Sequence, residues 1–136
     1  MTALTVSSGK NELSRIIEFI EMGLEVYDCT GLAWFEITET VEDIYTNIMR
    51  NAFPLEEGLI RVSINYIEVQ RAVEVSFFDN GVPYNPLGGK LLGQQIQGRR
   101  RQWESTAVAI MERAVDETSY VNINRKNITT IKKYLE

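Results

Sequence analysis

The sequence predicts a single α+β domain, a two-layer sandwich with helices on one face of a mixed, mainly antiparallel sheet. The chain has 136 residues, of which 44% are apolar, enough for one domain with a buried core. Apolar residues recur at helical spacing early in the chain and alternate with polar residues in the middle and at the end. The expected order is strand, two helices, two strands, a loop, a helix and two strands, which favours this fold class.

The first expected elements are a short strand and a helix. The run TALTV (residues 2–6) is typical of a strand, and Ser7 or Ser8 is expected to cap the helix that follows. Residues 10–27 place apolar side chains three or four positions apart, which indicates a helix with one apolar face. Gly31 lies in the break after this helix.

A second helix is expected from about Glu36 to Phe53, and Pro54 ends it, because proline disfavours a helical conformation in the residue before it. Asp43 and Asn47 fall on one side of this helix, away from most of its apolar stripe. A carboxylate and an amide one turn apart can hold a metal ion and a water molecule. They are also ordinary residues on a solvated helix face, so the helix alone leaves both interpretations open.

The remaining elements follow from alternation and helical spacing. Residues 58–69 and 72–79 alternate apolar and polar side chains and predict an antiparallel hairpin. Residues 105–119 have helical spacing, and residues 120–123 and 127–135 predict a closing hairpin.

The stretch FFDNGVPYNPLGGK (residues 77–90) carries the first functional signal. A strand ends on Asp79, and glycine, proline and asparagine follow at once. This composition is typical of a turn. Alternatively, Asp79 and Gly81 form the floor of a ligand pocket.

Composition excludes several classes of site. The chain has no histidine and one cysteine, which excludes serine–histidine and cysteine–histidine catalysis, the usual zinc sites and an intrachain disulfide. No apolar run approaches the length of a membrane span, so a cytoplasmic, soluble protein is expected. The net charge of -5 argues against general nucleic-acid binding. Residues 88–103 nevertheless hold four basic side chains and no acid, as expected for a segment that meets an anion or an acidic partner, or for a solvated loop.

Three segments together resemble a known family. They are VEDIYTNIMRNAF (residues 41–53), FFDNGVPYNPL (residues 77–87) and DETSYVNINRKNITTIKK (residues 116–133). In this order they look like the signature regions of the anti-sigma-factor serine-protein kinases. This family belongs to the ATPase superfamily that includes gyrase, histidine kinases and the MutL repair proteins. The resemblance covers about the whole chain and implies the histidine-kinase-like (Bergerat) fold with bound ATP and Mg²⁺.

The resemblance also implies roles for individual residues. Asp43 takes the place of the family's catalytic glutamate, and Asn47 matches the asparagine that coordinates magnesium. Asp79 matches the aspartate that accepts a hydrogen bond from the adenine amino group. Gly81 matches the glycine that lets the base lie close to the backbone.

The phosphate-binding part departs from the family pattern. The family commonly has a glycine-rich loop at the start of the last helix, where this chain has Glu104, Ser105 and Thr106. Ser105 and Thr106 are expected to bind phosphate, whereas Glu104 puts a negative charge where an anion should lie. Residues 88–103, with Lys90, are expected to close over the phosphates as a lid.

Two functions remain open at this stage. The resemblance implies a regulatory kinase that binds Mg-ATP and a sigma factor, phosphorylates a STAS-type antagonist protein and forms a homodimer. The substituted glycine loop favours the alternative, a non-catalytic interaction module on the same fold that has lost its nucleotide site. A small stand-alone hydrolase is disfavoured, because no second acidic cluster supports it.

Overall fold

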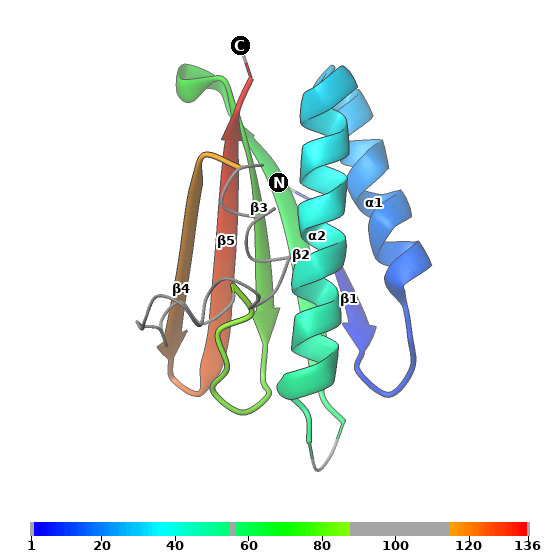
Figure 1. The fold of residues 1–136 in the computed structure, drawn as a ribbon, viewed down its shortest axis with the longest axis vertical. Coiled ribbons are helices and arrows are strands. Elements are labelled where there is room, and N and C mark those ends of the chain that lie inside the picture. Colours follow the sequence, from blue (N-terminus) through cyan, green and yellow to red (C-terminus); the bar gives the residue numbers. More distant parts are fainter. Residues whose placement is uncertain (1, 55–56, 88–114, 136) are drawn as a thin grey trace, which may run out of the picture.

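A computed structural model describes residues 2–54, 57–87 and 115–135, which form two layers (Figure 1). Helices α1 and α2 lie side by side over one face of a five-stranded sheet. The elements are β1 (Thr2–Ser7), α1 (Leu13–Val26), α2 (Gly31–Asn51), β2 (Leu59–Ile67), a 3₁₀ turn (Glu68–Gln70), β3 (Ala72–Asp79), β4 (Glu117–Ile123) and β5 (Lys126–Tyr134). The predicted two-layer α+β architecture is therefore confirmed.

The strand order in the sheet is β1-β2-β3-β5-β4, and every pairing among the described strands is antiparallel. Strand β5 thus lies between β3 and β4. In this register Asp79 at the end of β3 lies opposite Asn127 near the start of β5, and Phe77 lies opposite Thr129. The polar residues Asp79 and Asn127, which are far apart in the sequence, are thereby placed next to each other.

The core lies between the helices and the sheet, as the apolar spacing predicts. Helix α1 buries Ile16, Ile20 and Leu24, which recur every fourth position and so share one face. Fully burying an isoleucine or leucine side chain contributes about 1.5–3 kcal/mol relative to leaving it exposed. The buried residues that α2, β2 and β3 add to this core include Ile37, Val41, Ile44, Ile48, Ile60, Val62, Ile64, Val73, Val75 and Phe77.

The predicted N-cap of α1 is wrong. Ser7 belongs to β1, and its hydroxyl accepts a hydrogen bond from the backbone N–H of Gly9 at 2.9 Å. The hydroxyl of Ser8 accepts one from the N–H of Gly58 at 2.8 Å. Both serines therefore stabilise the turn after β1 and its contact with the start of β2, and neither lies at the helix terminus.

The predicted start of α2 is also wrong. The helix begins at Gly31, five residues before the expected Glu36. Gly31 has a φ of +67°, so the chain reverses at the glycine and enters the helix directly. The helix ends at Asn51, shortly before Pro54, as predicted.

The helix predicted over residues 105–119 runs too far. Strand β4 begins at Glu117, where the Lys132 ammonium lies 3.5 Å from the Glu117 carboxylate on the neighbouring strand. Pairing with β5 thus outweighs the helical spacing in this stretch. Residues 115 and 116 are not helical either. The part of that helix predicted over residues 105–114, the predicted lid over residues 88–103, and Lys90, Ser105 and Thr106 lie outside the described residues.

Neither α1 nor α2 is long and apolar enough to cross a membrane.

Candidate functional site

Asp79 is the last residue of β3, and its carboxyl group is oriented by two hydrogen bonds. The residue is 4% exposed. Its Oδ1 accepts from the backbone N–H of Gly81 at 2.9 Å and from the side-chain Nδ2 of Asn127 at 2.8 Å. Burial raises the pKa of the Asp79 carboxyl above its ordinary value, and the two hydrogen bonds act in the opposite direction. Asp79 is therefore a buried, oriented acceptor at the end of a central strand.

Helix α2 presents a polar stripe toward β5 and the loop after β3. Successive members of the set Glu36, Asp43 and Asn47 are separated by about 20° and 40° around the helix axis. The Glu36 carboxylate lies 2.7 Å from the Lys133 ammonium on β5, and the Asn47 Nδ2 donates to the carbonyl oxygen of Pro86 at 3.0 Å. These two contacts turn the stripe toward β5 and the loop after β3. Asp43 lies between them along the helix.

Two buried polar atoms in this region have no hydrogen-bond partner among the described residues. They are Oδ2 of Asp43 and Oγ1 of Thr129. From the Glu36–Lys133 contact, Asp43 is about 10.5 Å along α2, and Thr129 is about 13 Å along β5. The two elements run in opposite directions, so these atoms lie at a similar level between helix and sheet. Buried polar atoms of this kind commonly meet water or a ligand.

The pKa of the Asp43 carboxyl is raised, first by burial and then by repulsion from Glu39 and Glu42. An aspartate with a raised pKa is a better proton acceptor than an ordinary one, as a general base requires.

Gly81 packs against the end of α2. A Cβ atom added at Gly81 would lie 2.8 Å from both the carbonyl carbon and the Cβ of Ala52, and closer still to its carbonyl oxygen. The same carbonyl oxygen accepts a hydrogen bond from the Val82 N–H at 2.8 Å. The loop and helix thus approach too closely for any other residue at this position. This contact gives a reason for the glycine that is independent of a bound base.

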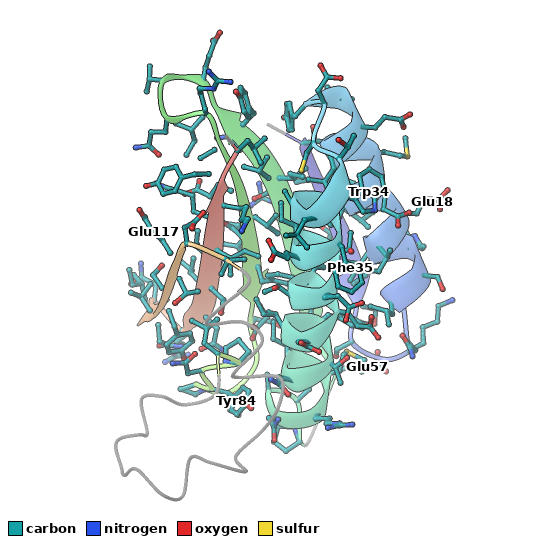
Figure 2. The ribbon with its side chains drawn as sticks, turned by 45° about the horizontal axis from the view of Figure 1, so that its top comes forward. Glu18, Trp34, Phe35, Glu57, Tyr84 and Glu117 are labelled. Atoms are coloured by element: carbon teal, nitrogen blue, oxygen red, sulfur yellow. The ribbon has the colours of Figure 1, made fainter. Side chains whose placement is uncertain are left out.

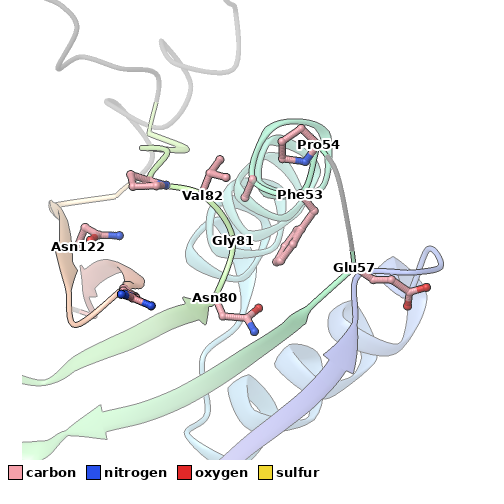
Figure 3. Close-up of a pocket in the computed structure, with 10 residues that line it drawn as sticks. Phe53, Pro54, Glu57, Asn80, Gly81, Val82 and Asn122 are labelled. Atoms are coloured by element: carbon pink, nitrogen blue, oxygen red, sulfur yellow. The ribbon is translucent and has the colours of Figure 1, made fainter.

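A cavity of about 380 Å³ lies beyond this loop (Figure 3). Of the candidate residues, Gly81 lines it, whereas Asp43, Asn47 and Asp79 do not. The remaining wall comes from the loop after β3, the residues between α2 and β2, and the β4–β5 hairpin: Ala52, Phe53, Pro54, Glu57, Asn80, Val82, Pro83, Asn122 and Arg125. The candidate residues therefore do not share one cavity.

Sequence reasoning missed Asn127 and Thr129. Both are fully buried and lie on the inner face of β5, where apolar side chains are the rule. The sequence signal that could have found them is their place in the alternation of β5: they are polar at inward positions, whereas the next inward residue is the buried Ile131. Asn127 also accepts a hydrogen bond from the Tyr120 hydroxyl.

The described residues hold no group of three acidic or cysteine side chains suited to a metal ion. Asn47, the expected magnesium ligand, lies on α2 with its side-chain nitrogen donating to Pro86. The structure does not describe Lys90, Ser105 and Thr106, the residues expected at the phosphates.

Comparisons of the sequence with known protein families and with curated proteins give no match. Among solved structures, the chain is similar to the "Histidine kinase domain from Erythrobacter litoralis EL346 blue-light activated histidine kinase". The TM-score is 0.59 over 90% of this chain, at 14% sequence identity. The chain has a histidine-kinase-like fold. It spans 61% of the length of that structure. The predicted fold is thus confirmed, and the narrower resemblance to anti-sigma-factor kinases stays a prediction.

Proposed function

We propose that this chain binds Mg-ATP between α2 and the β3–β5 end of the sheet, as a regulatory kinase resembling the anti-sigma-factor serine-protein kinases. The hydrogen bonding of the Asp79 carboxyl group is the observation that carries the proposal. Its two hydrogen bonds from the described residues both end on Oδ1. Oδ2 is then the acceptor offered to an exocyclic amino group, and a carboxylate in a buried site discriminates strongly between amine and carbonyl.

The polar stripe of α2 supports the rest of the proposal. Asn47 would hold the magnesium ion through its side-chain oxygen, since its nitrogen donates to Pro86. Asp43 would take the proton from the acceptor hydroxyl, a step that its raised pKa favours. Bound Mg-ATP would supply the phosphoryl group. The buried Oδ2 of Asp43 and Oγ1 of Thr129 give polar groups for a ligand to satisfy.

The proposed partners are a sigma factor and a STAS-type antagonist protein that carries the acceptor serine. The resemblance in the three signature segments supports them. The same resemblance supports a homodimer. Phosphate transfer from labelled ATP to an antagonist protein, abolished by Asp43→Asn, would establish the kinase activity, because removing a general base typically slows a reaction about 10²–10⁴-fold.

The second candidate is a non-catalytic interaction module on the same fold. Two observations favour it. The Gly81–Ala52 packing explains the glycine without a base, and Glu104 stands where the family binds phosphate.

Calorimetric titration with ATP, with and without magnesium, separates the two candidates. We expect wild-type protein to bind Mg-ATP and Asp79→Asn to bind it roughly ten- to a hundredfold more weakly, the cost of losing one hydrogen bond to a charged acceptor. Asp28→Asn is a matched control, because Asp28 is exposed, lies before α2 and has a φ of 58° that asparagine tolerates. Wild-type protein that binds no nucleotide under any metal condition would favour the interaction module.

A further inference from the structure

Asn127 holds the Asp79 carboxyl group through an amide that is itself fully engaged. The residue is 0% exposed. Its Nδ2 donates to Asp79 Oδ1 at 2.8 Å and to the carbonyl oxygen of Val82 at 2.9 Å. Its Oδ1 accepts from the Asn122 Nδ2 at 2.9 Å and from the Tyr120 hydroxyl. The amide thus joins the end of β3, the following loop and β4.

These partners determine which way the amide points. Both neighbours of Nδ2 are acceptors, a carboxylate oxygen and a carbonyl oxygen, whereas Asn122 meets Oδ1 with an N–H donor. A flipped amide would set its oxygen against two acceptors, which is strongly unfavourable in a buried site. Asn127 therefore has a single orientation, with an N–H directed at Asp79.

The fixed amide of Asn127 in turn orients the carboxyl group of Asp79. Its Oδ1 already accepts from Gly81, and the Asn127 N–H completes the hydrogen bonding of that oxygen. A half-turn of the carboxylate only exchanges its two equivalent oxygens, whereas a smaller rotation would lengthen both fixed contacts. Two tyrosines join this network: the Tyr120 hydroxyl donates to Asn127, and the Tyr84 backbone N–H donates to the Tyr120 hydroxyl. Burial raises the pKa of both phenols, which remain neutral. Figure 2 shows Tyr84 near the C-terminal end of α2.

We propose that Asn127 is the positioning residue for Asp79, and that its amide sets a preference for purines with an amino group at position 6 over purines with a carbonyl group there. This inference rests on the proposed function, because it concerns how the Asp79 site selects its ligand. An amino group requires an acceptor at Oδ2, and a carbonyl requires a donor. An ionised carboxyl group offers only acceptors, and a protonated one also offers a donor. Losing the Asn127 N–H, which donates to the ionised form, therefore weakens the selection.

The test is the ratio of ATP to inosine triphosphate affinity, measured by calorimetry with magnesium. Asn127→Leu has a similar shape and removes the N–H. We expect it to lose at least about tenfold in ATP affinity and to bring the ratio close to one, because one hydrogen bond to a charged group is lost. Asn127→Thr, which suits a strand and does not reach Asp79, is the second variant if Asn127→Leu does not melt cooperatively. Tyr120→Phe is the control, because it removes a contact of Asn127 Oδ1 and keeps the Asn127–Asp79 hydrogen bond.

Each outcome decides the inference. A wild-type preference for ATP that collapses in the Asn127 variants and persists in Tyr120→Phe would support it. Equal weakening of both nucleotides would show a purely structural role and overturn it, as would tighter ATP binding, which would mean that the amide occupies the place of the ligand amino group. If the wild-type protein binds neither nucleotide, the proposed function fails as well, and that result is seen without any variant.

Discussion

Replacing Gly81 by alanine tests whether this glycine serves the fold or a ligand. The new methyl group would lie 2.8 Å from two atoms of Ala52, so the loop must move away from the end of α2. Forcing a methyl group into a packed site costs about 1–3 kcal/mol. The same movement lengthens the Val82–Ala52 hydrogen bond of 2.8 Å, which is worth a further 0.5–1.5 kcal/mol or so. We therefore expect a loss of roughly 2–4 kcal/mol in the free energy of unfolding.

The assay is urea unfolding followed by circular dichroism, without any nucleotide. Gly31→Ala is the matched control, since Gly31 has a φ of +67° and nothing within 4 Å of its added Cβ, so that only the backbone conformation opposes the methyl group. That cost is about 1–2 kcal/mol. If Gly81→Ala unfolds at the wild-type urea concentration but binds ATP poorly, the packing explanation is refuted and clearance for a base is the reason for the glycine.

Three further predictions concern the polar residues between helix and sheet. Asp43→Asn should stabilise the fold, because the folded-state pKa of Asp43 is raised above its ordinary value of 3.8 and the stability of the wild-type protein therefore falls as pH rises through this range. In urea unfolding, the gain in the free energy of unfolding should be absent at pH 3 and present at pH 7. Thr129→Val should leave thermal stability unchanged or raised, since it removes a buried hydroxyl without a described partner, and should weaken ATP binding in calorimetry; a clear loss of melting temperature would show that the hydroxyl has a structural partner. Lys133→Met leaves Glu36 without its 2.7 Å ion pair and should lower the free energy of unfolding by about 1 kcal/mol, whereas Glu36→Gln combined with Lys133→Met should recover part of that loss in a double-mutant cycle.

Much of the fold could be predicted from local patterns in the sequence. Strand β3 occupies the predicted residues 72–79, because apolar alternation and the glycine and prolines after it give the same boundaries. The start of α2 could not be predicted, since the sequence indicates a break at Gly31. This glycine is instead the first helical residue, in a conformation that few other residues adopt. The third helix was predicted to run too far for a related reason. The helical spacing of Val115 and its neighbours carries no information about pairing with strand β5.

The candidate site was predictable only in part. Asp79 and Asn47 were found because their neighbours in the sequence form recognisable motifs. Asn127 was not, since its importance comes from lying opposite Asp79 in the β3–β5 register, 48 residues away in the sequence. A role that arises from strand pairing leaves no local signal beyond a polar residue at an inward position.

The position of β5 between β3 and β4 has a consequence for how the protein is made. Strand β3 can pair with β2 as soon as the local hairpin closes, but its other edge stays open until residues 126–134 have left the ribosome. During that interval an unpaired edge strand is exposed to other chains, a common start of misassembly. Closing the long β3–β5 connection is also slow, because its entropy must be lost before the contacts form. The Asp79–Asn127 hydrogen bond would then form late, so the same pair that would select a ligand would also mark the completion of folding.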